Sequence, residues 1–477
     1  MRMKFKTLVI ILLTAVFQLN AQTRDITITV HIRGVWNSKI SLLALFGPNA
    51  GKPLAELPPV KSGESAIVTV AKDQLPGEFV IRFDYKDKEI SAPYPSEKHI
   101  FVYSQNLELF INPPFCNNSD STWFQKGEIE NTVYAEFSKE NFKQKEKLGA
   151  LQNFLMSYDD TQSVLYRTGI TEYEKRRTNY NQWIEKQIAQ HKKTFVSNAF
   201  KFQYVPAMEW KDSLVDRVHN MIAHYFDGID FKDPHILKTS DMIQWMNKYV
   251  NIYGAMSTTP ALRDSLLSVA ATIAIDKARA GGNPFVYGWM VDYFYNGFEA
   301  SNIPVGVKAL QPYLDDPSCY TNKKQQIEKR LEGIKKLVVG SPAPDFTVTD
   351  DADAAKSFVT YPTTCRYKLV LFWSAGCDHC KELIKKLYPW YQQAINKKTV
   401  VVFALGMDDT EPDIKLWDKV HPLLEGWKHM LPQGGINSKV ANAYFILSSP
   451  VMVLVDAQTN NIVAIPETVE QLEAAMK

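Results

Sequence analysis

The sequence predicts a multidomain protein with an N-terminal antiparallel β-sandwich, a central all-α bundle and a C-terminal α/β domain. Two observations lead to this fold class. The chain has 477 residues, enough for about three domains of ordinary size. The spacing of its apolar residues also changes twice, from alternation to helical spacing and then to strands that alternate with helices. We place these domains at residues 22–115, 125–338 and 339–477.

Residues 1–21 have the features of a secretory signal peptide. A basic head precedes an apolar run from Leu8 to Phe17, and Ala21 offers a small residue before a cut. The run is too short to cross a bilayer comfortably, and no later stretch reaches the roughly eighteen apolar residues of a membrane span. We expect a cleaved signal peptide, a periplasmic or otherwise exported protein, and no transmembrane segment in the mature chain. A buried N-terminal helix or an uncleaved anchor is the alternative.

The charges are balanced. Lysine and arginine total 54 against 52 for aspartate and glutamate, and without residues 1–21 the balance is 51 to 52. Such a chain has no surplus of cations to attract nucleic acid, so we expect no nucleic-acid partner. The composition, 45% hydrophobic and 22% charged, is typical of soluble globular proteins.

The N-terminal part shows the period of two that half-buried strands have. Turn residues such as Gly47-Pro48-Asn49 separate its apolar runs, and Pro113-Pro114 ends the pattern. The predicted strands are Ile26–Ile32, Ile40–Phe46, Ala66–Val70, Phe79–Tyr85, Ile100–Tyr103 and Leu107–Ile111.

The middle part, from about Asn131 to Val338, has apolar residues at helical spacing. Asp233-Pro234 and Thr259-Pro260 stand just before helical runs, where a capping side chain and a proline belong. We expect roughly eight helices, whose many aromatic residues form a buried face more readily than a ligand platform.

The C-terminal part alternates strands with helices, which predicts an α/β domain with a mixed sheet. The run from Leu369 to Trp373 is continuous and apolar, as in a central strand that is buried on both faces. The other predicted elements are a helix at Asp378–Asn396 kinked by Pro389, strands at Thr399–Leu405, Val451–Val455 and Ile462–Ile465, and a closing helix at Glu467–Met476.

Two cysteines, Cys377 and Cys380, lie where this central strand ends and a helix begins. The free N–H groups and the dipole of a helix N-terminus favour an anion, and the reactive form of cysteine is the thiolate. One thiolate can attack a substrate disulfide while the other resolves the mixed disulfide. We therefore predict that Cys377 is the nucleophile and Cys380 the resolving thiol.

Two other interpretations of this cysteine pair, a zinc site and an inert structural disulfide, fit less well. A zinc site would need two more ligands, and the nearby Cys365, His421 and His429 supply no second pair at metal spacing. An inert structural disulfide does not account for the position between strand and helix. We expect no metal and no cofactor. Cys116 and Cys319 lie in loop-like sequence, where they either pair or stay free and buried.

The C-terminal part resembles the thioredoxin superfamily, and more closely the exported TlpA-like and ResA-like thiol–disulfide oxidoreductases. The resemblance covers about Val339 to Lys477 and rests on Gly340–Phe346, Phe372–Cys380 and Ser449–Asp456. Proteins of Bacteroides-type bacteria join such a domain to N-terminal β and helical regions in a similar layout. The resemblance implies a thioredoxin-like fold in which Pro450 is cis and lies against the dithiol. It also implies that Trp373, Ser449 and Pro450 contribute to substrate binding.

The chain departs from these families in how it would handle protons. The buried acid that thioredoxin carries before its motif corresponds to Leu371, and the glutamate of the ResA-like pattern corresponds to Leu383. Glu382 lies one residue early, about 100° around the helix, so that Glu382 or water remains to take the proton. Gly376 replaces an aromatic residue that commonly precedes the first cysteine, which would leave the sulfur more open.

The two residues between the cysteines are expected to tune the redox potential in opposite directions. His379 resembles the histidine of DsbA-like oxidants, which favours the thiolate and the reduced form. Asp378 opposes this effect, because a carboxylate beside a thiolate raises the cost of the charge. We therefore expect an intermediate potential.

The function predicted from these residues is an exported thiol–disulfide oxidoreductase. Its partners would be proteins that carry a disulfide or a dithiol, and the resemblance implies a membrane electron donor of the DsbD or CcdA type. The alternative is an envelope client-binding or scaffold protein in which the thioredoxin-like domain is secondary.

Overall fold

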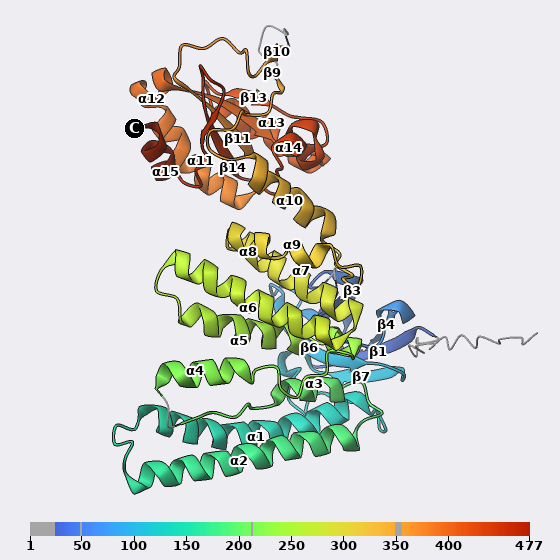
Figure 1. Cartoon of the computed structure of the whole chain (residues 1–477). Coiled ribbons are helices and arrows are strands. Elements are labelled where there is room, and N and C mark those ends of the chain that lie inside the picture. The colour runs from blue at the N-terminus through green and yellow to red at the C-terminus, as the bar shows by residue number, and fades with distance from the viewer. Residues whose placement is uncertain (1–23, 48–49, 211–212, 349–354) are drawn as a thin grey trace, which may run out of the picture. The chain divides into compact units, whose positions relative to one another are not determined.

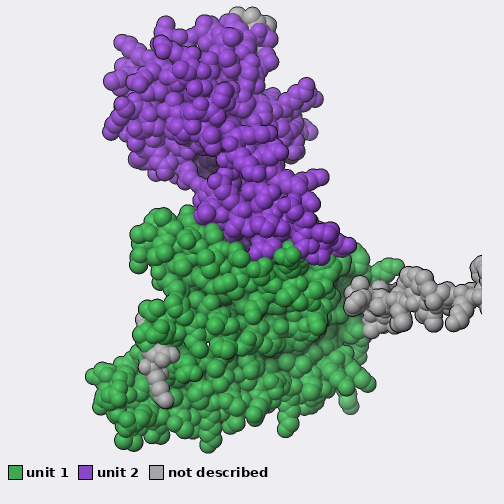
Figure 2. All heavy atoms as spheres, in the orientation of Figure 1, with its two compact units in different colours: residues 1–290 green, residues 291–477 purple. Residues whose placement is uncertain are grey.

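The computed structural model describes residues 24–47, 50–210, 213–348 and 355–477 (Figure 1). The predicted signal peptide at 1–21 lies outside these residues. Contacts divide the chain into two units, residues 1–290 and 291–477, and the boundary falls inside helix α7 (Figure 2). The chain is multidomain and contains both sheets and helices, whereas the domain boundaries expected near residues 115, 125 and 338 stay predictions.

Two four-stranded sheets in unit 1 share one apolar core. Their strand orders are β4-β1-β7-β8 and β3-β2-β5-β6. Apolar residues of both sheets, including Ile28 of β1 and Phe83 of β5, are fully buried in the same cluster. The strands are β1 (Ile26–Ile32), β2 (Asn37–Ala44), β3 (Pro53–Lys61), β4 (Ser65–Val70), β5 (Gly77–Lys86), β6 (Tyr94–Val102), β7 (Leu107–Ile111) and β8 (Trp123–Phe124).

Two features of this region differ from the prediction. The first sheet is not wholly antiparallel, because β1 pairs with β7 in parallel. The long chain between these strands, which builds the second sheet, supplies the crossover that a parallel pair requires. Strand β3 was also missed, because Pro53, Pro58 and Pro59 argue against a strand. A proline is tolerated there because β3 lies at the edge of its sheet.

The middle of the chain is helical, and its caps follow the sequence. Thr259 accepts a hydrogen bond from the backbone of Leu262 and starts α6. The helices are α1 (Glu130–Ser157), α2 (Val164–Gln190), α3 (Ser197–Phe200), α4 (Leu214–Ala223), α5 (Asp241–Ala255), α6 (Pro260–Gly281), α7 (Pro284–Ala300), α8 (Pro304–Ala309), α9 (Gln311–Leu314) and α10 (Lys324–Lys336). Within the described ranges, no helix combines the length and apolar character needed to cross a membrane.

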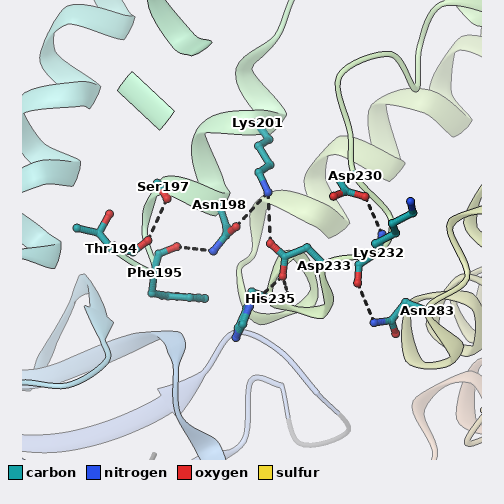
Figure 3. A network of polar contacts seen from close by, with 10 residues as sticks. All are labelled: Thr194, Phe195, Ser197, Asn198, Lys201, Asp230, Lys232, Asp233, His235 and Asn283. Carbon is teal, nitrogen blue, oxygen red and sulfur yellow. Dashed lines mark hydrogen bonds and ion pairs between the residues drawn. The ribbon is translucent and has the colours of Figure 1, made fainter. Parts of the chain in front are cut away.

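A polar cluster in unit 1 joins α3 to the short 3-10 helix at Pro234–Lys238 (Figure 3). The Lys201 Nζ donates to Asn198 at 3.2 Å and to Asp233 at 3.3 Å. Asp233 also accepts from the backbone of His235 at 3.0 Å and bonds its ring at 2.8 Å. Burial alone would raise the pKa of Asp233, but the bonds from His235 and the charge of Lys201 outweigh it and lower this pKa to about 2.

The C-terminal sheet is mixed, as predicted, with the order β13-β12-β11-β14-β15. Strand β11 is parallel to β12 and antiparallel to β14. The elements are β9 (Thr347–Val348), β10 (Lys356–Ser357), β11 (Tyr367–Trp373), α11 (Asp378–Tyr391), α12 (Ala394–Thr399), β12 (Val400–Gly406), α13 (Glu411–Val420), β13 (Lys428–Met430), α14 (Lys439–Ala443), β14 (Val451–Asp456), β15 (Ile462–Ala464) and α15 (Val469–Met476).

Strand β11 is buried on both faces, which fixes its position at the centre of the sheet. Leu369 and Leu371 pack into one apolar cluster, while Val370 and Phe372 pack into a second cluster. Lys368 is also buried, at 1% exposure, and its Nζ donates to the carbonyls of residues 358 and 359 and to Asn460. These three bonds satisfy a cation that would otherwise oppose burial of the strand.

The helix after the cysteines is shorter than predicted. Helix α11 includes Pro389 but ends at Tyr391, and a separate helix, α12, begins at Ala394. The side-chain amide of Asn396 in α12 donates to the carbonyl of Trp390 in the last turn of α11 at 2.8 Å, which bridges the break between the two helices. The apolar spacing that continues to Ile395 therefore spans two helices, because periodicity alone does not record a short interruption.

Acid should destabilise the wild-type protein more than the variant Asp233→Asn. The folded-state pKa of Asp233 lies below the ordinary 3.8, so its carboxylate stabilises the fold above that pH and this contribution is lost as the pH falls toward 2. We expect an extra loss of about 1–2 kcal/mol in the wild type between pH 4 and pH 2, measured by urea unfolding.

The matched control for this experiment is Asp230→Asn. Asp230 lies on the same loop but bonds only the backbone of Lys232 in Figure 3. This variant should follow the wild type across the pH range. If the wild type and Asp233→Asn lose the same unfolding free energy between pH 4 and pH 2, the stabilising role of the Asp233 carboxylate is contradicted.

Candidate active site

The two cysteines stand where β11 passes into α11. Cys377 is the N-cap residue of α11, and its Sγ accepts a hydrogen bond from the backbone N–H of Cys380 at 3.3 Å. Its side chain is half-buried. A sulfur in this position faces the unpaired N–H groups and the positive end of the helix dipole, both of which favour a thiolate.

Cys380 lies one turn further and has a different environment. It is fully buried, at 0% exposure, and its Sγ accepts from the backbone N–H of Ser374 at 3.5 Å. Burial raises the pKa of the Cys380 thiol, and its hydrogen bond with Cys377 raises it further. The pair therefore combines an accessible sulfur with a covered one that retains its proton.

The loop before β14 touches both sulfurs. The Cys377 thiol donates to the carbonyl of Ser449 at 3.6 Å, and the Cys380 thiol donates to the Ser449 hydroxyl at 3.5 Å. The peptide bond between Ser449 and Pro450 is cis. The structure thus brings four of the predicted site residues together, although Ser449 and Pro450 follow Cys380 by about seventy residues.

Trp373 does not share this surface. Its indole is 1% exposed and packs in the core beneath the site, with its ring N–H buried. The ring packs in the same apolar cluster as Leu387 of α11 and so stabilises the end of β11. Its predicted role in substrate binding would require this ring to be uncovered.

The residues expected to tune or assist the thiols point elsewhere. The Asp378 carboxylate is 92% exposed and bonds Lys381 at 2.9 Å, and this bond lowers the pKa of Asp378. His379 is exposed, and among the described hydrogen bonds none joins its ring to a sulfur. Glu382 pairs with Lys385 on the exposed side of α11, and this hydrogen bond lowers its pKa. Glu382 is therefore poorly placed to take a proton from the buried Cys380.

A buried carboxylate that the sequence analysis missed lies behind the cysteine loop. Asp408 is 3% exposed and accepts from the Ser374 hydroxyl at 2.6 Å and from the backbone N–H of Ala375 at 3.2 Å. Strands β11 and β12 are parallel with Trp373 opposite Gly406, so residues after both strands meet at one edge. Polar residues at the ends of two neighbouring parallel strands are the signal that would have found Asp408.

A second carboxylate lies close to the glycine before Cys377. A Cβ at Gly376 would lie 3.2 Å from an oxygen of Asp413, on α13. An aromatic side chain at this position would press on Asp413, which also bonds its own N-cap residue, Thr410. A side chain at residue 376 would therefore require the Asp413 carboxylate to shift.

The other cysteines, Cys116, Cys319 and Cys365, are free. Cys116 is buried and its thiol donates to the carbonyl of Glu97 at 3.2 Å. Burial raises the pKa of Cys319 to about 11. In the described residues, no three His, Cys, Asp or Glu side chains are grouped so as to hold a metal ion.

The chain is similar over part of its length to several solved structures. A thioredoxin-like protein from Bacteroides caccae is 19% identical, with 57% of this chain and 96% of that chain covered at a TM-score of 0.38. The thioredoxin domain of a thiol-disulfide oxidoreductase from Bacteroides vulgatus is 27% identical, with 30% and 99% covered at a TM-score of 0.25. A thiol:disulfide interchange protein from Bacteroides sp. is 28% identical, with 29% and 88% covered at a TM-score of 0.24. No family model and no curated protein matches the chain.

Replacing Asp408 by asparagine should destabilise the protein by roughly 1–3 kcal/mol, because the carboxylate accepts two hydrogen bonds that one amide oxygen cannot fully replace. Urea unfolding measures this loss. The control is Asp409→Asn, the exposed neighbour. An unchanged unfolding free energy in Asp408→Asn would show that Asp408 does not hold the cysteine loop.

Proposed function

We propose that the C-terminal part of the chain is a thiol–disulfide oxidoreductase that exchanges disulfides with other proteins through Cys377 and Cys380. The observation that carries this proposal is the asymmetry of the two sulfurs. One is half-buried at a helix N-terminus, the other is fully buried in the first turn, and the same serine before a cis proline contacts both.

The first step is an attack by Cys377. Its thiolate attacks one sulfur of a client disulfide, so that a bond forms between Cys377 and the client while the client's own S–S bond breaks. The sulfur that leaves takes up a proton from solvent. The helix N-terminus supports this step, because it stabilises the negative charge on Cys377 before the attack.

The second step is resolution by Cys380. Its sulfur attacks Cys377, a disulfide forms between the two residues, and the second client thiol is released. The client gains two electrons and two protons, and the dithiol loses them. The Ser449 hydroxyl is the side-chain acceptor bonded to the Cys380 thiol, so we assign it as a relay that accepts this proton while passing its own hydroxyl proton to solvent or to the departing client thiolate. This assignment takes the place of Glu382, which faces Lys385.

The proposal includes export through the signal peptide at residues 1–21 and recycling by a membrane electron donor of the DsbD or CcdA type. The basic head and apolar run of these residues support export. In an oxidising compartment the disulfide between Cys377 and Cys380 would persist, so a reductant such as this donor has to supply two electrons to restore the dithiol after each cycle.

Insulin reduction driven by dithiothreitol should be accelerated by the wild type. The variant Cys377→Ser should fall to the rate of dithiothreitol alone, because it lacks the nucleophile. After removal of dithiothreitol, the reduced variant Cys380→Ser mixed with insulin should accumulate a covalent complex, because no thiol is left to resolve the mixed disulfide. Turbidity measures the rate, and non-reducing gel electrophoresis detects the complex.

The matched control is Cys365→Ser. Cys365 belongs to the same unit, and its thiol lies 3.7 Å from the carbonyl of Lys397 rather than in the dithiol. This variant should keep the wild-type rate. Equal rates for the wild type and Cys377→Ser would eliminate the oxidoreductase proposal and favour an envelope protein that binds clients without redox chemistry.

A further inference from the structure

A pocket in unit 2 lies between the C-terminal sheet with the loop before β14 and residues that precede this sheet in the chain. Its volume is about 520 Å³, and Leu383 of α11 and Pro450 form part of its lining. The opposite wall comes from residues before the sheet, including Arg330, Ile334 and Leu337 at α10 and its end. Figure 2 shows the space-filling surface of unit 2, which is hollowed on the face turned to the viewer.

We propose that this pocket is the docking site for an apolar, extended segment of the client polypeptide next to its reactive cysteine. The inference rests on the proposed function and adds a substrate class to it. It also assigns residues of α10, outside the thioredoxin-like part, to the choice of client.

Polar contacts hold the two walls together. The Lys329 Nζ of α10 donates to the carbonyl of Ile446 at 3.1 Å and to Asn442 at 2.7 Å. Asn302, just before α8, bonds Glu467, just before α15. The pocket is thus bounded by elements that are bonded to each other across it, as a preformed binding site requires.

The floor of the pocket contains an unusual backbone. Phe445 has a φ of 49°, a conformation that bulky residues rarely adopt. A Cβ at Gly333 of α10 would lie 2.7 Å from the Cβ of Phe445, so only glycine allows this approach. Strained residues of this kind persist where the surrounding structure holds them, and they concentrate at binding and switch regions.

The charge of the lining favours an uncharged occupant. The charged lining residues are Glu299, Arg330 and Glu467. Glu299 pairs with Arg330 at 2.9 Å, and Glu467 accepts from Asn302. Much of the remaining lining is apolar, which suits an apolar segment, and an anionic segment would meet the carboxylate of Glu467 with the cation of Arg330 already paired.

The position of the pocket favours a polypeptide that is joined to the reacting sulfur. Ser448 and Pro450 line the pocket, and the carbonyl of Ser449 between them lies 3.6 Å from the Cys377 Sγ. An extended chain advances about 3.3 Å per residue, so residues two or three positions from the client cysteine would reach the pocket. A free small ligand would not explain why the pocket is lined by the two residues on either side of Ser449, which contacts the Cys377 sulfur.

The test uses single-turnover oxidation of the reduced full-length protein by three disulfides. Two are peptides that differ only in having Leu and Val or Gly and Ser beside the cysteine, and the third is hydroxyethyl disulfide. The wild type should react at least tenfold faster with the apolar peptide than with the Gly/Ser peptide. The variants Ile465→Glu and Ile334→Glu should lose this preference, because each places a charge in the pocket lining.

The matched control is Ile395→Glu, which adds the same charge at an isoleucine of unit 2 that is 71% exposed and outside the pocket. It should keep the preference. Ile465 is itself 41% exposed, so its variant is expected to fold, and an unchanged rate with hydroxyethyl disulfide verifies an intact dithiol.

Two results would overturn the docking proposal while leaving the oxidoreductase proposal intact. The wild type reacts equally with both peptides, or both pocket variants keep the preference. A loss of reaction with hydroxyethyl disulfide in the pocket variants alone also counts against it, since the pocket would then support the dithiol. Failure of the wild type with all three disulfides would instead contradict the oxidoreductase proposal itself.

Discussion

The interaction on which the site depends is the hydrogen bond from the Cys380 backbone to the sulfur of Cys377, which caps helix α11. This bond holds the Cys377 sulfur at the N-terminus of α11, next to backbone N–H groups that have no partner within the helix. The position of that cap follows from strand β11, whose seven residues are all buried. Strands β12 and β14 pair with β11 on both sides and fix its position in the sheet. The backbone pairing of β11 therefore determines where α11 starts.

Features that depend only on the local sequence around β11 were predictable, and features that depend on how β11 pairs with other strands were not. The continuous apolar run and the two cysteines lie within fifteen residues, so β11, the start of α11 and the pair itself were predictable from local pattern. The cis Pro450 against the dithiol was expected only through the family resemblance, and the contacts of Ser449 with both sulfurs were not predicted. Asp408 was missed because only the parallel register of β11 with β12 brings it to Ser374. Strand β3 was missed because its prolines are read as breaks unless its edge position is known.

The absence of an acid at Leu371 and Leu383 changes how the buried thiol is held. Leu371 packs in the core and Leu383 lines the adjoining pocket, so the described neighbours that bond Cys380 are the backbone of Ser374, the Cys377 sulfur and the Ser449 hydroxyl. None of these groups carries a permanent charge. Burial is then the largest cause that raises the pKa of this thiol, and the buried carboxylate of Asp408 acts on it only through the position of Ser374.

The uncharged surroundings of Cys380 suggest a role for the helical segment that precedes the C-terminal sheet. A buried thiol whose hydrogen-bond partners are uncharged contributes little to distinguishing one client disulfide from another. Discrimination then has to come from surface that the client touches beyond its sulfurs. Helix α10 supplies such surface, because Gly333 lets it approach Phe445 and Lys329 ties it to the same loop. Selection of a client by its flanking residues and reaction at Cys377 would then be separable properties, carried by different segments of one unit.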